Sequence, residues 1–203
     1  MRLLFLILCL CTQTTFAQLS ESKWLISGVY HTGAVDSTTY WGVGARGEWR
    51  VHERVSLNYN LERIGRRDNI SHWHSSAGSF LGPPLIIFGL ISSADNEFFN
   101  LGGWGTALGI LALIAPDGAS FHIPYRFNWE FSPYANILGV DFMKNRNNDK
   151  FYIRYGASFG VKTSYWMENN WTLQGFLETR KVAGVNWSLG GGVGIGYSFG
   201  TRD

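Results

Sequence analysis

The sequence predicts an all-β protein: an eight-stranded, antiparallel, transmembrane, up-and-down β-barrel with one long and partly apolar insertion. Three observations lead to this fold class. Apolar and polar residues alternate along most of the chain, aromatic residues make up 16% of it alongside 25 glycines, and its first residues form an export signal. A soluble helical domain would contain fewer glycines and more Glu, Lys and Ala.

Residues 1–17 carry the features of a secretory signal peptide. Arg2 supplies the positive start, residues 3–11 form an apolar core, and Thr-Phe-Ala at 15–17 is a small-residue cleavage signal. The apolar core is too short to cross a bilayer, which argues against a permanent anchor helix. We therefore expect a signal peptide followed by a single barrel domain at 18–203.

Cysteine content and charge exclude several classes of protein. Both cysteines, Cys9 and Cys11, lie in the signal peptide, so the exported chain would hold neither a disulfide nor a cysteine-based metal site. Without Arg2 the 17 basic residues become 16, against 15 acidic ones. This balance argues against nucleic acid as a partner, and we expect no cofactor.

Alternation with a period of two places successive side chains on opposite faces of a strand. From Lys150 to Met167, for example, apolar Phe159 is followed by Gly160 and preceded by polar Ser158. The same pattern, weaker in the first and fifth segments, recurs along the chain. It predicts eight strands, at residues 24–33, 40–51, 55–62, 120–128, 133–143, 150–167, 171–180 and 185–199.

Turns and tryptophans indicate the two edges of a membrane. Short polar turns at 52–54, 128–130 and 168–170 fall at every second junction, which is typical of a periplasmic rim, and longer loops are expected at the other rim. Indole side chains prefer the level of the lipid headgroups. We place Trp24, Trp49, Trp129, Trp166 and Trp171 beside the short turns, and Trp41 and Trp187 near the opposite rim.

A soluble, lipocalin-like binding barrel would also show alternation. In that fold the apolar face is the interior, and the face that meets water tends to be dense in Lys and Glu. Here the polar face is rich in Gly, Ser and Asn, with isolated charges of both signs, which suits a tight interior. We therefore expect the apolar face to contact outer-membrane lipids.

In this pattern the chain resembles the eight-stranded outer-membrane barrel superfamily, the OmpA/OmpX-like proteins, and in particular the small barrel proteins of Bacteroidota. The resemblance covers the signal peptide and nearly all of residues 24–199. The segment Gly191–Phe199 is similar to the aromatic-terminated signal that the family's insertion machinery reads, although 200–203 follow it here. The resemblance implies a porin-like fold in the outer membrane of a Gram-negative bacterium, with lipids and the insertion machinery as partners.

The polar face of the predicted strands carries charged and titratable residues. An eight-stranded barrel is only wide enough for side chains to fill it, so these residues should pair with one another, and transport through a pore is disfavoured. The predicted interior charge network consists of Arg46, Glu48, Arg50, Glu62, His122, Arg126, Asp141, Arg154, Lys162, Glu178 and Arg180.

Residues 66–117, a span of 52 residues between the third and fourth strands, form the predicted insertion. Connections of this length are usually functional or disordered, and the apolar stretches 83–91 and 104–114 argue against disorder. We interpret the segment as one or two short helices or strand extensions that form a lid, or a surface for a protein partner or lipid acyl chains. Its candidate binding residues are Trp73, Phe88 and Trp104.

The segment Ser71–Ser76 is the candidate for chemistry, because a histidine beside a serine can act as base and nucleophile. It is similar to the His-x-Ser-x-Ala pattern of lipid A deacylases, whose residues lie on a late strand instead. On a strand, His74 would serve Ser76 rather than Ser75. His72 and His74 could also bind a metal, but no third ligand is evident, so we expect none.

Taken together, these features favour a non-enzymatic outer-membrane protein in envelope structure or surface interaction. A lipid A-modifying enzyme, either an acyl hydrolase or an acyltransferase, is the alternative, and it would use His74 and Ser76 as its catalytic residues. The soluble binding barrel is the second alternative.

Overall fold

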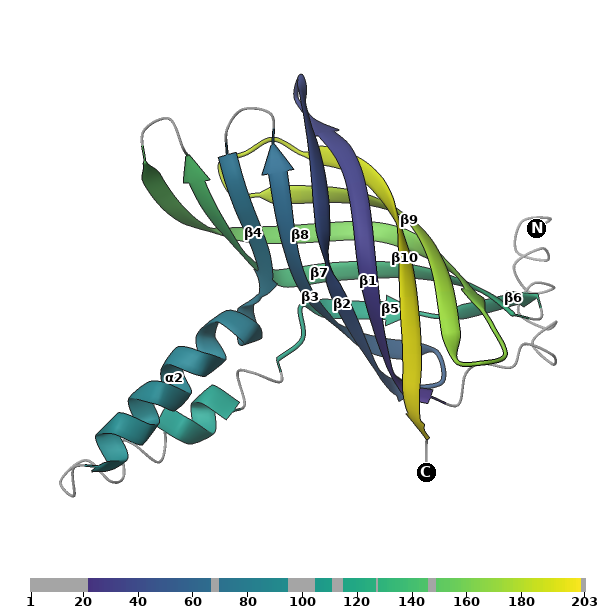
Figure 1. The fold of residues 1–203 in the computed structure, drawn as a ribbon, viewed down its shortest axis with the longest axis horizontal. Helices are drawn as coiled ribbons and strands as arrows, with labels where there is room; N and C mark the ends of the chain where they lie inside the picture. The colour runs from purple at the N-terminus through teal and green to yellow at the C-terminus, as the bar shows by residue number, and fades with distance from the viewer. Residues whose placement is uncertain are drawn as a thin grey trace, which may run out of the picture.

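The computed structural model describes residues 22–66, 70–94, 105–110, 115–126, 128–145 and 149–201. Antiparallel strands form a single closed sheet in which the first and last strands, β1 and β10, also pair (Figure 1). The strands are β1 (Ser22–Val35), β2 (Thr38–His52), β3 (Val55–Arg66), β4 (Ile70–Ser76), β5 (Gly118–Phe121), β6 (Ile123–Arg126), β7 (Trp129–Asn145), β8 (Lys150–Trp166), β9 (Trp171–Val182) and β10 (Ser188–Thr201).

These ten strand segments fill eight positions in the ring, because β4, β5 and β6 share one position between β3 and β7. β4 pairs with both neighbours over one half of their length, and β5 pairs with both over the other half. β6 continues along β7. The predicted eight-stranded up-and-down barrel is thereby confirmed.

The faces of the strands are arranged as in a membrane barrel. Along β9, polar Thr172 and Gln174 are buried in the interior, whereas Leu173 and Leu177 are exposed on the outside. A row of glycines on β10, among them Gly192 and Gly196, makes room inside the barrel for larger side chains of its neighbours. This polar core with an apolar exterior is the reverse of the lipocalin-like alternative.

Short connections join neighbouring strands at both rims of the barrel. The rim at which β1 begins and β10 ends is called the terminal rim here. It has the predicted tight turns, with described turn residues at 53–54, 128 and 167–170. At the opposite, far rim the longest connection, 183–187, has five residues. This differs from the expectation of longer loops there, because the long insertion does not emerge at a rim.

The insertion is helical, but it lies within the fourth strand of the barrel. α2 (Ala77–Ala94) follows β4 directly, a second helical segment at 105–110 packs against α2, and the chain re-enters the wall at β5. Residues 70–76, predicted as the start of the insertion, are therefore strand. Their alternation is weak because Trp73 is the one large apolar side chain on their outer face. Hydrogen-bonded pairing with β3 and β7, rather than a local sequence pattern, makes these residues a strand.

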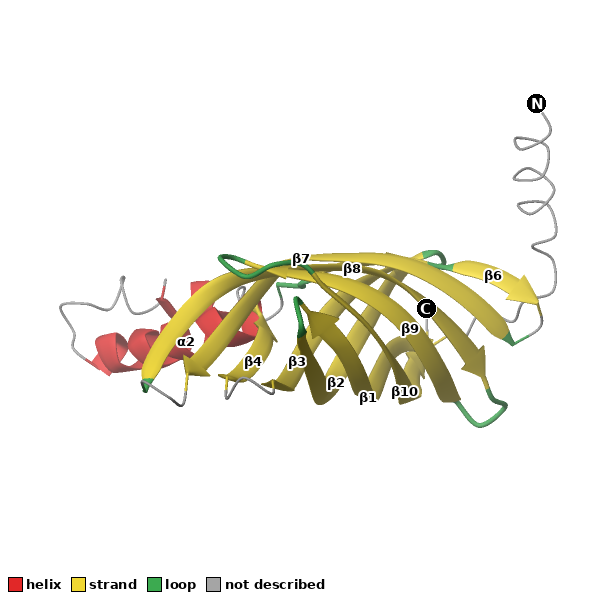
Figure 2. Cartoon of the chain, turned by 90° about the horizontal axis from the view of Figure 1, so that it is seen from above, coloured by secondary structure: helices red, strands yellow, loops and turns green. Residues whose placement is uncertain are grey.

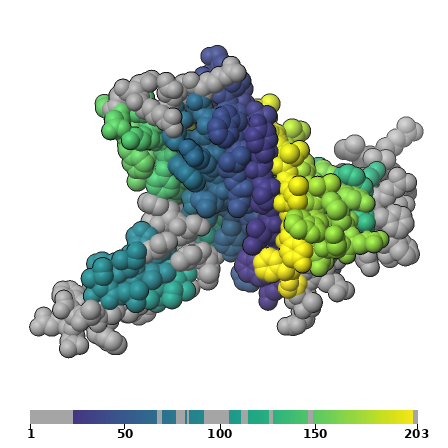
Figure 3. Space-filling view, in the orientation of Figure 1, coloured from purple at the N-terminus to yellow at the C-terminus, as the bar shows by residue number. Residues whose placement is uncertain are grey.

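The two helical segments together, 77–94 and 105–110, are called the helical hairpin below. Figure 2 shows the hairpin beside the ring of strands and outside it, and in Figure 3 it forms a lobe that stands away from the barrel surface. Among the described residues, no helix combines the length and the hydropathy needed to cross a bilayer.

Candidate functional site

The centre of the barrel holds an ion-pair cluster of two arginines and two glutamates. Glu62, which is fully buried, lies 2.7 Å from Arg46 and 2.5 Å from Arg180. Glu178 lies 3.0 Å from each of the same two arginines, and the Tyr134 hydroxyl donates to it at 2.8 Å. Each carboxylate therefore bridges two guanidinium groups, and the four charges cancel across a water-poor interior.

A second charged group fills the interior toward the terminal rim. Arg50 Nη2 lies 2.6 Å from Glu130 Oε2, and His122 Nδ1 lies 2.7 Å from the other oxygen of Glu130. Lys162 pairs with Glu48. Because all five side chains are buried, their charges are paired inside the barrel rather than solvated by bulk water, although Arg50 Nη1 has no hydrogen-bond partner.

Two histidines share one buried carboxylate on the β4 side of the interior. Asp141 Oδ1 contacts His72 Nε2 and lies 3.1 Å from His74 Nδ1. Asp141 is fully buried, and both histidines are nearly so. The pairing of β4 with β7 produces this arrangement, since His74 and Asp141 are directly opposite each other in the register.

The structure places most of the predicted interior charges in these three groups. Arg154 is the exception, since it lies half-exposed at the far rim and donates to the Ala183 carbonyl at 2.5 Å. Arg126 belongs to β6, but its side chain lies outside the described residues. Sequence reasoning missed Glu130, which it assigned to a turn, and Tyr134, although both alternate with the outward Phe131.

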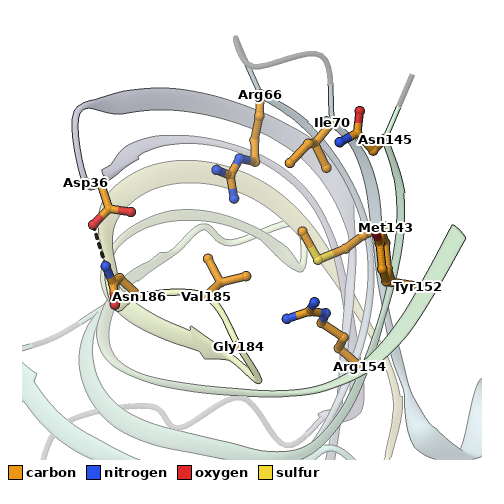
Figure 4. A pocket seen from close by; sticks show the side chains of 10 residues that line it. All are labelled: Asp36, Arg66, Ile70, Met143, Asn145, Tyr152, Arg154, Gly184, Val185 and Asn186. Carbon is orange, nitrogen blue, oxygen red and sulfur yellow. Dashed lines mark hydrogen bonds between the residues drawn. The ribbon is translucent and has the colours of Figure 1, made fainter. Parts of the chain in front are cut away.

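The far rim opens into a cavity of about 370 Å³, shown in Figure 4. Arg66 and Arg154 point into the cavity from opposite walls, and Asn186 Nδ2 donates to Asp36 Oδ1 at 2.7 Å across its edge. Beneath it a space of about 30 Å³ is bounded in part by His72 and other interior residues. The mouth is therefore polar, open on the far rim and closed by the charged interior.

The catalytic candidates do not reach this mouth. His74 is 1% exposed and Ser76 is fully buried, and neither lines the cavity. Within the described part of the chain, no group of three or more His, Cys, Asp or Glu side chains is arranged to hold a metal ion. His74 instead shares the buried Asp141 carboxylate with His72.

The three candidate binding residues lie in different places. Trp73 is on the outer face of β4, where it is 46% exposed and Arg63 lies 5.6 Å from its ring centroid. Phe88 is exposed on α2. Trp104 lies outside the described residues. The sequence therefore grouped residues that the fold assigns to the barrel wall and to the hairpin.

Most of the tryptophans face outward near the rims, as expected for interfacial side chains. Trp24 stacks on Trp49 with ring centroids 5.5 Å apart near the terminal rim, and Trp41 and Trp187 are half-exposed near the far rim. Trp166 differs from the expectation. It points inward, is 8% exposed, and its ring centroid lies 5.2 Å from the Arg50 guanidinium.

No protein-family model and no curated sequence matches the chain. Among solved structures it is similar to Neisserial surface protein A, with 11% identity and a TM-score of 0.53 over 89% of this chain and 98% of that one. The N-terminal barrel of Pseudomonas aeruginosa OprF gives 11% identity, 87% and 98% coverage and a TM-score of 0.49. Ail of Yersinia pestis is 8% identical, with a TM-score of 0.46 over 88% of this chain and 97% of that one.

At such low identity the similarity shows the fold alone. The argument for the fold rests on Neisserial surface protein A, whose TM-score is 0.53. The fold is an eight-stranded antiparallel β-barrel, like that of Neisserial surface protein A. An apolar exterior around a polar, charge-paired interior is the arrangement of a β-barrel whose outer face meets lipid.

Proposed function

We propose that the chain is a non-enzymatic barrel protein of the outer membrane of a Gram-negative bacterium, acting in envelope structure or surface interaction. The observation that carries this proposal is the charge-paired interior. It fills the space that a pore would need, and the candidate catalytic residues His74 and Ser76 are buried within it.

A pore is disfavoured because the central cluster reaches across the barrel. Arg46 of β2 contacts Glu178 of β9 at 3.0 Å and the Tyr134 hydroxyl of β7 at 3.3 Å. Two small spaces border this cluster, one of about 20 Å³ beside Arg46 and one of about 30 Å³ beside Arg180, and each is comparable to the room needed by one or two water molecules. Opening a path would require breaking several buried ion pairs at once.

Catalysis on lipid A is disfavoured because its candidate residues face the closed interior. A lipid acyl chain would reach the protein from outside the wall, whereas His74 and Ser76 point to the inside and are at most 1% exposed. Surface interaction instead has the far-rim cavity available, with Arg66 and Arg154 at its walls.

The proposal is tested in three measurements on the exported protein. Fractionation should recover it in the outer membrane with heat-modifiable gel mobility, and mass spectrometry should find its first residue to be Gln18. In planar bilayers the purified protein should produce no discrete conductance steps. Recovery as a soluble periplasmic species, or stable stepwise conductance, would contradict the proposal.

The enzymatic alternative has its own test. Expression of the wild-type protein should leave the mass spectrum of extracted lipid A unchanged, and so should expression of His74→Ala or Ser76→Ala. An acylation or deacylation mass shift that the wild type produces and both variants lose, while each variant keeps its folded gel mobility, would establish the enzyme instead.

A further inference from the structure

The helical hairpin leaves the barrel wall at half its height. On β3, Leu61 is the last residue opposite β4 and Asn58 the first opposite β5, so the break faces the middle of the strand. On β7 the corresponding residues are Gly139 and Asn136, which places the break opposite 137–138, the midpoint of Trp129–Asn145.

The neighbouring strand β7 shows the depth of this exit point. About eight residues separate it from either end of β7, which corresponds to roughly 20 Å for a strand tilted by about 40°. The apolar band of such barrels is about 25 Å tall, so the exit lies well inside it. The outward side chains at this level are apolar, with Leu61, Ile137 and Leu138 about half exposed.

Backbone hydrogen bonds close the wall where the strand is interrupted. The Asp117 amide donates to the Asn58 carbonyl at 2.7 Å, and the Asp117 carbonyl accepts from the amides of Ile137 and Leu138 at 2.9 and 2.8 Å. The neighbours of the missing strand segment therefore keep partners, as a wall inside hydrocarbon requires. Within α2 the helix bonds its own interior backbone groups, apart from its ends and the carbonyl groups that lack a donor at Pro83 and Pro84.

The hairpin is apolar around its circumference and contains no Asp, Glu, Lys or Arg within 77–94 or 105–110. The described side chains of α2 expose apolar surface in several directions rather than along one stripe. The most exposed are Ile87 (57%), Leu90 (60%) and Ile91 (68%), with Leu108 (51%) and Ile110 (53%) on the second segment.

Glycines hold the two helical segments close together. A methyl group at Gly109 would lie 2.6 Å from the Ile86 nitrogen, and one at Gly105 would lie 3.1 Å from the Gly89 Cα. Small residues four apart permit such backbone approach, which is how helices associate in lipid, where burial of apolar surface gives no driving force. The contact between the two helical segments therefore uses their glycine-containing faces, and the large apolar side chains remain on the outside of the hairpin.

We infer that the helical hairpin is an intramembrane arm, embedded in the hydrocarbon of the bilayer with its Ile and Leu side chains against lipid acyl chains. It continues the lipid-facing belt of the barrel, since it emerges from the middle of that belt and carries the same kind of surface. The inference rests on the proposed membrane location of the barrel. It gives the insertion a lipid environment instead of the role of a lid over the mouth.

Single-cysteine labelling tests the inference in the full chain, with Cys9 and Cys11 replaced by Ser. Ile91→Cys reports on the hairpin, Leu177→Cys on the outer belt of the barrel, and Ser37→Cys on the far-rim turn. In lipid vesicles Ser37→Cys should react readily with a charged maleimide, whereas Ile91→Cys should be protected to the level of Leu177→Cys. An environment-sensitive fluorophore, attached in denaturant before refolding, should be quenched at Ile91→Cys by lipids brominated on their acyl chains.

Comparing the three labelled positions distinguishes failure of the inference about the hairpin from failure of the proposed membrane insertion of the barrel. If Ile91→Cys reacts as fast as Ser37→Cys while Leu177→Cys stays protected, the hairpin is in water and the inference is overturned. If Leu177→Cys also reacts, the proposed membrane insertion of the barrel fails. Protection of Ile91→Cys without quenching by brominated lipid would mean that protein covers the arm, either a second copy or another chain, and would also overturn lipid contact.

Discussion

Removing one charge from the central cluster should destabilise the barrel strongly. In Glu62→Gln the side chain keeps its shape, but Arg46 and Arg180, at 2.7 and 2.5 Å, lose one of the two carboxylates that bridge them, so two positive charges share the single carboxylate of Glu178. Breaking a buried ion pair by removing one partner costs about 3–5 kcal/mol, because the remaining charge stays buried without compensation. We expect a loss of this size in the free energy of unfolding.

The assay is urea unfolding of the protein in lipid vesicles, followed by tryptophan fluorescence and by heat-modifiable gel mobility. Glu168→Gln, on an exposed turn residue, serves as the matched control and should change stability by at most about 0.5 kcal/mol. The double variant Glu62→Gln/Arg180→Gln should lose less than the sum of the single variants, by about 1 kcal/mol or more. A loss below about 1 kcal/mol for Glu62→Gln would refute the view that the cluster is a paired core.

Two further comparisons use matched positions and the same assay. Phe159 is 41% exposed near the middle of β8, and Phe159→Arg should lower the free energy of unfolding by about 2–4 kcal/mol. Ser158→Ala removes one 3.2 Å hydrogen bond inside the barrel and should lower it by about 1 kcal/mol. The reverse ranking would mean that the two faces are exchanged. Gly118→Ala should destabilise the barrel by about 1–3 kcal/mol, because the added methyl would lie 1.8 Å from the Ala135 carbonyl oxygen, while Gly28→Ala meets nothing within 4 Å and should be neutral within about 0.5 kcal/mol. Equal effects of the two glycine substitutions would contradict the close approach of β5 to β7 at Gly118.

The alternation of side chains was sufficient to predict the barrel, because lipid outside and a narrow interior impose opposite polarities on neighbouring residues. Where the outward residues are themselves small and polar, this signal fails. On β4 the outward positions beside Trp73 are Ser71 and Ser75, so the strand resembled a loop in sequence. Its structure depends on the strands on either side, which no local pattern records.

The interior charges could be predicted as a set but not as pairs. Glu62 and Arg180 are 118 residues apart and meet because β3 and β9 face each other across the barrel, which depends on the register of every strand between them. Glu130 was missed because a turn residue and the first inward residue of a strand look alike in sequence. His74 was taken for a loop residue, and its place opposite Asp141 follows from the β4–β7 register alone.

The position of the arm has a consequence for how the molecule fits among its neighbours in a membrane. A plain cylinder presents the same outline from every side, whereas this one carries a projection at a single azimuth, the fourth of its eight positions. β10 occupies the eighth position, on the opposite side of the ring, and there Val193 and Ile195 form a smooth apolar wall. With the arm in the bilayer as proposed, neighbouring proteins would approach closely on the β10 side and be held at a distance on the other, which gives the barrel two different sides in the plane of the membrane.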